Sequence, residues 1–224
     1  MKIDILTLFP DVALAPLNES IIKRAQDNGI VDIQAHQLRD WAEGNYKKCD
    51  DYPYGGGVGL VLKPEPIFKA IDDLRTPDSH IILMTPQGKS FKQADAQRLS
   101  TTHQHLIFIC GHYEGVDHRV VEALVDEELS IGDYVLTNGA IASAVITDSI
   151  VRLIPGVLGD DQSSVEESFS DPNLLESPSY TKPAEYRGLK VPDILLSGHH
   201  GKIAEWRHQQ AISRTKANRP DLCE

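Results

Sequence analysis

Short, continuous apolar runs alternate with segments of helical periodicity through the first two thirds of the chain. Strands that are apolar throughout are typical of a parallel sheet that is covered on both faces. The alternation therefore predicts an α/β fold, with a parallel sheet and helices on both of its faces. The expected strands are 3–9, 30–34, 80–84, 106–110 and a short one at 134–136. The expected helices are 18–28, 63–74, 92–99, 118–125 and 140–153.

The composition suits a globular protein of ordinary size. The 224 residues are 41% hydrophobic, enough for one large domain or for a large and a small one. The net charge of −11 argues against a basic surface overall, but it leaves room for a local basic patch. The three cysteines lack C-x-x-C spacing, so we expect reduced thiols in a cytoplasmic protein and no zinc ribbon. Asp4 interrupts the first apolar run, so no secretion signal or membrane span is expected.

The charge changes sign towards the C-terminal end. Residues 159–178 carry six carboxylates and no Lys or Arg, which is typical of a loop or linker. Between Lys182 and Arg219, eight basic and three acidic residues give a net charge of +5. We expect a main domain at 1–158, a flexible acidic linker at 159–178 and a small helical domain at 179–224. Charge alone does not decide between a basic binding surface and a solvated helical tail.

Three glycine-containing loops follow expected strands, at 85–88, 111–117 and 130–139. In open α/β sheets ligands bind beyond the carboxyl ends of the strands, so converging loops of this kind predict a nucleotide or cofactor pocket. Each loop alone is also explained by the needs of a tight turn. The chain has no G-x-G-x-x-G, no P-loop, no G-x-S-x-G and no H-E-x-x-H, so classical dinucleotide, hydrolase and zinc sites lose support.

Two further features have both a functional and a plain structural interpretation. Residues 52–59 hold four glycines beside Tyr52 and Tyr54, and this segment is either a base-stacking loop or a flexible surface turn. Arg152 ends the last expected helix. It either complements the helix dipole or stabilises a developing oxyanion while a linker carboxylate takes a proton.

An ordered set of motifs carries a family resemblance. The chain resembles the bacterial tRNA (guanine-N1)-methyltransferases of the knotted SPOUT class, over essentially its whole length. No single motif is specific, but the ordered set is. The motifs are LFP (8–10), RD (39–40), DDYPYGGGVG (50–59), TPQG (85–88), CGHYEGVD (110–117), SIGDYVL (130–136), RLIPGVLG (152–159), YTKP (180–183) and VPDILLSGHH (191–200).

The resemblance implies a fold and an activity that composition alone does not. It implies a deep trefoil knot in the C-terminal half of the main domain, followed by a small helical domain that grips the anticodon stem-loop of tRNA. It implies a homodimer with the active site at the subunit interface. The implied reaction moves a methyl group from S-adenosylmethionine to N1 of the guanosine on the 3′ side of the anticodon. A magnesium ion is a candidate helper at O6 or at phosphate.

The resemblance also assigns roles to residues of this chain. Arg152 matches the catalytic arginine, and Glu167 falls on the position of the general base, with Glu166 and Asp171 as substitutes. The expected cofactor residues lie in the three glycine-containing loops: Met84, Thr85, Pro86, Gly111, Tyr113, Glu114, Ile131, Gly132, Asp133, Tyr134, Val135, Leu136 and Gly139. The expected RNA-binding residues are Tyr54, Gly55, Gly56, Gly57, Lys182, Arg187, Arg207 and Arg214.

The chain departs from the family pattern at several of these positions. The general base of the family is an Asp, whereas Glu167 has one more methylene. A family G-G-E-L-P is 138–142 (NGAIA) here, and family Arg and Asn positions are His112 and His199. Two rival readings therefore stay open. One is a catalytically weak or inactive SPOUT-like RNA-binding protein, and the other is a SPOUT methyltransferase that acts on a different RNA base.

Overall fold

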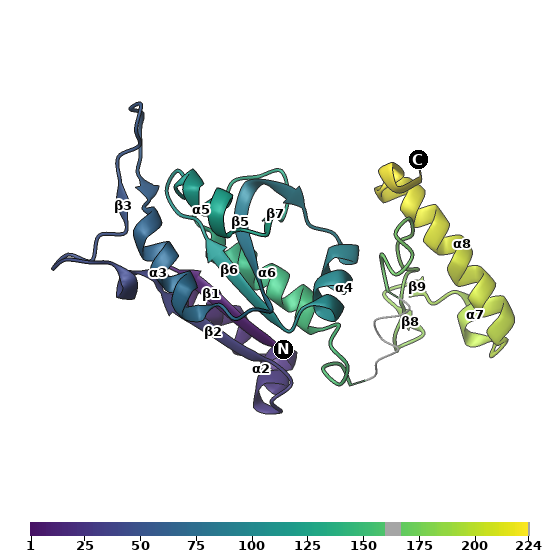
Figure 1. Ribbon diagram of the computed structural model, residues 1–224. Helices are drawn as coiled ribbons and strands as arrows, with labels where there is room; N and C mark the ends of the chain where they lie inside the picture. The colour runs from purple at the N-terminus through teal and green to yellow at the C-terminus, as the bar shows by residue number, and fades with distance from the viewer. Residues whose placement is uncertain (160–166, 224) are drawn as a thin grey trace. The chain divides into compact units, whose positions relative to one another are not determined.

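The computed structural model describes residues 1–159 and 167–223, and it divides into two compact units. The first unit is Met1–Asp160 and the second is Asp161–Glu224. Figure 1 shows the first unit in purple to green and the second in green to yellow. Among the described residues, no helix is long and apolar enough to cross a membrane.

The first unit is built on a five-stranded sheet in the order β2-β1-β6-β5-β7, with every strand parallel to its neighbours. Four of the five expected strands are confirmed in position, with ends that differ by a few residues. The strands are β1 (Lys2–Thr7), β2 (Asp32–Gln37), β5 (Ser79–Ser90), β6 (His105–Cys110) and β7 (Glu127–Ser130). β6 is buried along its whole length because it lies at the centre, between β1 and β5.

Helices cover both faces of this sheet, as the apolar strands predict. One core contains side chains of α1 (Pro10–Leu14), α2 (Ser20–Asp27), α4 (Gln93–Thr102) and α6 (Gly139–Val151). The other contains side chains of α3 (Pro64–Leu74) and α5 (His118–Leu124). The short elements between them in the chain are η1 (Ala15–Leu17), η2 (Leu38–Trp41), and the paired strands β3 (Asp50–Asp51) and β4 (Val61–Leu62).

The strand expected at 134–136 is wrong. Tyr134 is 55% exposed and Val135 is 83% exposed, so these apolar residues lie in a surface loop. The strand comes earlier, as β7, where Leu129 and Ser130 are buried and pair with β5. β7 begins with two glutamates, which are tolerated because the strand lies at the edge of the sheet. They interrupt the apolar pattern from which a strand is predicted. The helix α1 was also not expected; Pro10 begins it, at a position where the missing proline N–H costs nothing.

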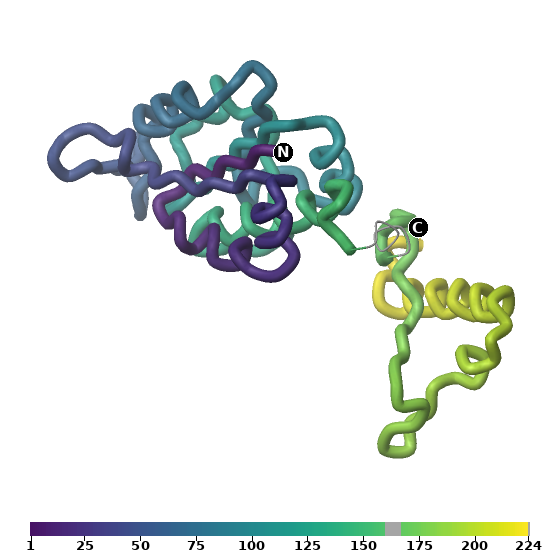
Figure 2. The backbone as a smooth tube through the Cα atoms, turned by 90° about the horizontal axis from the view of Figure 1, so that it is seen from below, coloured from purple at the N-terminus to yellow at the C-terminus, as the bar shows by residue number. Residues whose placement is uncertain are grey.

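The second unit has a small core. It holds the two-stranded ladder β8 (Glu185–Tyr186) and β9 (Leu189–Lys190), the helices α7 (Asp193–Leu196) and α8 (His200–Asn218), and η4 (Pro220–Cys223). Among its described residues only Ala211 and Thr215 are buried. The Leu175 N–H donates to Thr215 Oγ1 at 2.9 Å, which ties the segment before the ladder to α8. Figure 2 shows α8 along one side of this unit and the ladder projecting away from it.

A buried carboxylate crosslinks three strands of the first unit. Asp4 on β1 has no exposed surface; its Oδ1 lies 2.7 Å from His36 Nε2 on β2, and its Oδ2 lies 2.7 Å from His105 Nε2 on β6. Lys2 Nζ approaches Oδ2 at 2.7 Å. Burial alone would raise the pKa of Asp4, but its bonds to His36, Lys2 and His105 lower the pKa to about 2.

This network predicts a specific acid sensitivity. Because the pKa of Asp4 is lower in the folded chain than its ordinary 3.8, its stabilising effect is complete above that value and is lost as pH falls through about 2. The contribution is about 2–3 kcal/mol at neutral pH. We expect Asp4→Asn to lose about this much stability at pH 7 and little near pH 2. Urea unfolding at a series of pH values measures the difference between the two proteins. A constant difference across the series would contradict this account.

Candidate functional site

The three glycine-containing loops meet at the carboxyl end of the sheet, as expected. They surround a pocket of about 630 Å³ in the first unit. One wall comes from the irregular part of β5 after Met84, a second from the segment after β6, and a third from the segment between β7 and α6. Of the expected cofactor residues, these line the pocket: Met84, Thr85, Pro86, Gly111, Tyr113, Glu114, Ile131, Tyr134, Val135, Leu136 and Gly139.

Close backbone contact joins two of these walls at Gly139. Its N–H donates to Gly111 O at 2.8 Å. A Cβ at Gly139 would lie 3.0 Å from Cys110 Cα and 3.0 Å from Gly111 N, closer than backbone atoms tolerate without moving. Asn138 caps α6, because its Oδ1 accepts from the Ala140 N–H at 2.9 Å. The sequence at 138–139 therefore fixes where α6 begins relative to the pocket.

Two expected cofactor residues, Gly132 and Asp133, do not line the pocket. Gly132 has φ +150°, and the ring of Tyr134 lies where a side chain at 132 would be. This glycine thus shapes the loop rather than the pocket wall. Sequence reasoning also missed some lining residues, most of which are close neighbours of expected ones. They include Gln87, His112, Glu128, Thr137, Asn138 and Ala142.

A cluster of aromatic rings lies at one side of the pocket, where His112 and Tyr113 line it. The ring of His112 lies 4.2 Å from that of Tyr113 and 5.2 Å from that of Phe9, edge-on in both cases. Tyr113 has φ +58°, an unusual left-handed conformation for a bulky residue. Burial raises the pKa of Tyr113 and the Asp50 carboxylate raises it further, so its phenol is neutral at physiological pH. His112 Nδ1 is buried and has no hydrogen-bond partner among the described residues.

The pocket walls combine three kinds of chemistry. Apolar side chains such as Leu129, Ile131 and Leu136 offer surfaces for a flat ring, and the loop backbones offer hydrogen-bonding groups. Glu114 and Glu128 add carboxylates that favour a cation. The pocket thus suits a ligand that has a flat apolar part, hydroxyl groups and a positive charge.

The loop at 52–59 shares its base with this pocket. β3 and β4 pair below the loop, and the Glu114 N–H donates to Leu60 O at 3.0 Å. The side chain of Tyr54 is fully exposed and Tyr52 is 79% exposed. Gly55, Gly56 and Gly57 all have positive φ, so the tip follows a path that other residues rarely adopt. The expected RNA-binding residues of this loop are therefore presented to solvent.

The two expected catalytic residues belong to different units. Arg152 is the C-cap of α6 in the first unit, where its N–H donates to Asp148 O at 3.1 Å, and its side chain is partly exposed. Glu167 belongs to the second unit and is also partly exposed. Its backbone closes a short turn with Ser170, because the Ser170 N–H donates to Glu167 O at 3.1 Å. Glu166, an expected substitute base, lies outside the described residues.

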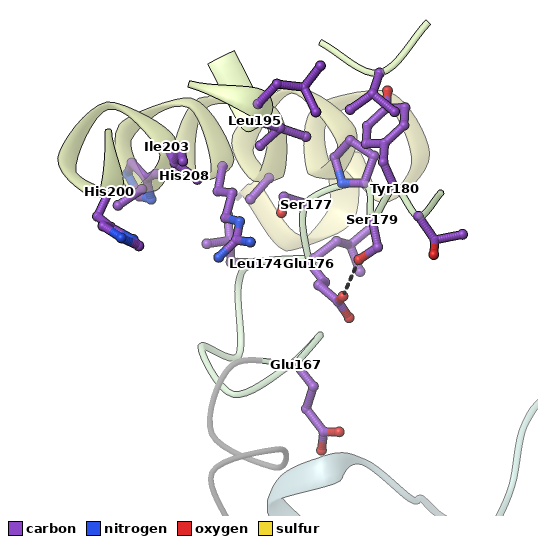
Figure 3. Close-up of a pocket in the computed structure, with 18 of the residues that line it drawn as sticks. Glu167, Leu174, Glu176, Ser177, Ser179, Tyr180, Leu195, His200, Ile203 and His208 are labelled. Atoms are coloured by element: carbon purple, nitrogen blue, oxygen red, sulfur yellow. Dashed lines mark hydrogen bonds between the residues drawn. The ribbon is translucent and has the colours of Figure 1, made fainter. Parts of the chain in front are cut away.

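Glu167 lines a second pocket, of about 1100 Å³, which lies within the second unit. Figure 3 shows its side chain extending away from α8, while Leu195, Ile203 and His208 lie on the helical side. Asp171 lines the same pocket, and its Oδ1 accepts from the Asn173 N–H at 2.9 Å.

The basic residues expected to bind RNA in the second unit are all exposed. Lys182 and Arg207 line the second pocket, whereas Arg187 and Arg214 do not. Among the residues that the structure describes, no cluster of three His, Cys, Asp or Glu side chains is arranged to hold a metal ion.

Comparison with known proteins shows which proteins this chain is similar to. A family model for tRNA (guanine-1)-methyltransferase TrmD matches residues 1–224. The tRNA (guanine-N(1)-)-methyltransferase of Staphylococcus carnosus is 56% identical over 223 residues, which cover 99% of this chain and 90% of the relative. The protein of the same name from Bacillus cereus strain AH820 is 54% identical over 227 residues, covering 100% of this chain and 92% of the relative.

Proposed function

This chain belongs to the tRNA (guanine-1)-methyltransferase TrmD family, and we propose that it transfers a methyl group from S-adenosylmethionine to N1 of a guanosine in tRNA. The guanosine that we propose is at position 37, on the 3′ side of the anticodon. The pocket at the carboxyl end of the sheet is the observation that carries this proposal, because three loops with matching motifs converge there.

The pocket fits S-adenosylmethionine by size and by chemistry. Its volume of about 630 Å³ lies within the usual range for small-molecule sites. The sulfonium is positive, and Glu114 and Glu128 supply negative charge in the walls. The buried Nδ1 of His112, which has no hydrogen-bond partner in the described part of the chain, is a further polar group that a bound ligand can satisfy. When bound, S-adenosylmethionine supplies an electrophilic methyl group.

The proposed roles of the protein side chains follow from the chemistry of guanine. N1 carries a proton and is a poor nucleophile until that proton leaves. Glu167 takes the proton as general base, and Arg152 stabilises the negative charge that grows on O6. The proposal that both residues act on one guanosine rests on the sequence motifs. A free nucleophile on the enzyme is not needed, because the sulfonium already activates the methyl group.

We propose that two exposed surfaces hold the tRNA. Tyr54 and the glycines beside it present an aromatic ring suited to stacking on an unpaired base of the anticodon loop. Lys182, Arg187, Arg207 and Arg214 lie in the segment of net charge +5 and suit phosphate groups. Such binding weakens as salt rises, even though the whole chain is acidic.

The homodimer and the knot are part of the proposal. Phe9 and Val12 at α1 and Ile141 and Val145 on α6 are between 37% and 46% exposed, and these two helices pack together. An apolar face of this kind supports burial against a second copy of the chain.

The short contact between Gly139 and the segment after β6 supports a chain that passes closely through the pocket loops, as a trefoil knot requires.

Methylation of a defined RNA tests the proposed function. Purified protein is incubated with unmodified tRNA transcript and S-adenosylmethionine, and the digested product is analysed by mass spectrometry. We expect 1-methylguanosine at position 37 and nowhere else. A transcript with adenosine at that position serves as the control and should stay unmethylated. A methyl group on another base would favour the rival methyltransferase. RNA binding without methylation would favour the rival binding protein, which the altered residues at 167 and 140 motivate.

A further inference from the structure

The β8–β9 ladder of the second unit presents an unusual pair of side chains. The two strands are joined by Arg187 and Gly188, whose φ values of +51° and +79° are those that a type I′ turn requires. Asn, Asp or Gly is favoured at the first of these positions, so Arg187 carries a conformational cost there. The Arg187 guanidinium carbon lies 5.2 Å from the centre of the Tyr186 ring, which is a cation–π contact.

Burial within the described part of the chain does not account for these residues of the ladder. Every residue from 179 to 190 is exposed, with Tyr186 at 60% and Leu189 at 77%. Tyr186 and Leu189 are direct partners across the ladder. A two-stranded ladder is only marginally stable in water on its own. The exposed pair of Tyr186 and Leu189, which the tight turn holds at the tip of the ladder, therefore points to a binding partner.

The charges around the tip favour RNA over a protein surface. Lys182, Arg187 and Lys190 lie within or beside the ladder, in the segment of net charge +5. Among the described residues, Lys190 pairs with the exposed Glu185 at 3.7 Å, and such surface pairs contribute little and exchange readily with phosphate. An arginine stacked on a tyrosine keeps its N–H edges available for phosphate oxygens while the other face of the ring stays open.

We propose that this tip, Tyr186–Leu189, is a base-stacking contact for an unpaired nucleotide of the RNA substrate. Tyr186 stacks on the base, Leu189 covers its edge, and Arg187 holds the adjoining phosphate. The inference rests on the proposed function, since it assumes that RNA is the substrate. It adds a site to that function, because the charge pattern alone marks Arg187 as a phosphate contact and gives Tyr186 and Leu189 no role.

Binding to two matched RNAs tests the stacking contact. One is the anticodon stem-loop, which has unpaired bases, and the other is a blunt duplex of the same stem. We expect Tyr186→Ala to weaken stem-loop binding by about 5- to 150-fold and to leave duplex binding unchanged. Tyr186→Phe keeps the ring and should bind within about twofold of wild type. Arg187→Gln should lower the slope of log affinity against log salt by about 0.7–0.9.

Controls separate this inference from simpler explanations. Tyr46→Ala removes another tyrosine, 95% exposed, from the first unit and should bind both RNAs as wild type does. Thermal melting should change little in any variant, because the replaced side chains are exposed and the cation–π contact between Arg187 and Tyr186 lies at the surface. Unchanged stem-loop binding by Tyr186→Ala, or a loss shared by Tyr186→Phe, overturns the stacking contact. A change in oligomeric mass without a change in RNA affinity assigns the tip to a protein interface and also overturns it.

The two proposals fail in different ways. If wild type does not methylate tRNA while Tyr186→Ala still weakens stem-loop binding, the proposed activity falls and the stacking contact stands. If wild type methylates and Tyr186→Ala binds normally, the activity stands and the stacking contact falls.

Discussion

We expect Glu167→Gln to lower kcat for methyl transfer by about 10²–10⁴-fold and to leave the affinities for tRNA and S-adenosylmethionine unchanged. This expectation follows from the role of the carboxylate, since an amide of the same shape cannot accept the N1 proton. Glu167 is partly exposed and its side chain extends away from α8, so the replacement removes little packing. Single-turnover kinetics with saturating tRNA and cofactor measure the chemical step separately from binding.

Two matched variants sharpen this test. Glu167→Asp keeps the carboxylate but moves it by about one methylene, and a displacement near 1 Å can cost about 10²-fold. We therefore expect its rate to lie between those of Glu167→Gln and wild type. Asp171→Asn changes another carboxylate of the same pocket, which already accepts a backbone N–H, and should leave the rate unchanged. A Gln variant as fast as wild type, together with a slow Asp171→Asn, would move the general base to Asp171.

Most of the sheet could be predicted because its central strands carry apolar runs that are buried on both faces. β1, β5 and β6 are apolar runs, and their burial leaves a signal that needs no knowledge of neighbours. β7 could not be found in this way, because it is an edge strand whose first two residues are glutamates. Val135 belongs to an apolar run that resembles a strand in the sequence, but the residue is exposed and lies in a loop. The other edge strand, β2, was predicted, so local pattern fails at β7 because of its polar opening residues rather than because of its place at the edge.

The candidate site shows the same division between local and distant information. The loops that line the pocket were predictable, because each follows a strand and strand ends of a parallel sheet meet at one edge. The partners of Asp4 were not predictable, since His36 and His105 lie 32 and 101 residues away in the sequence. The edge-on contact between Phe9 and His112 was not predictable either, because it depends on how the start of α1 lies against the segment after β6. Contacts between remote segments need the fold itself.

The expected catalytic arginine has a structural role that any test of its chemistry must separate. Arg152 is the C-cap of α6, where a positive side chain also complements the helix dipole by about 0.3–1 kcal/mol. If it stabilises charge on O6, Arg152→Gln lowers kcat by about 10²–10³-fold, far more than a stability change of that size explains. Cofactor affinity, measured by calorimetry without RNA, should stay close to wild type.

Arg152→Lys distinguishes charge from geometry. Lys keeps the positive charge that interacts with the helix dipole, so Arg152→Lys should melt as wild type does. Thermal melting measures the stability of both the Lys and the Gln variants. A guanidinium directs a planar pair of N–H donors at an acceptor oxygen, whereas an ammonium is a compact point charge. We expect Lys to recover the stability in full but only part of the rate, because the developing charge on O6 needs donors in a fixed position. If Gln retains the wild-type rate, Arg152 is a helix cap alone, and the oxyanion needs another donor from the pocket loops.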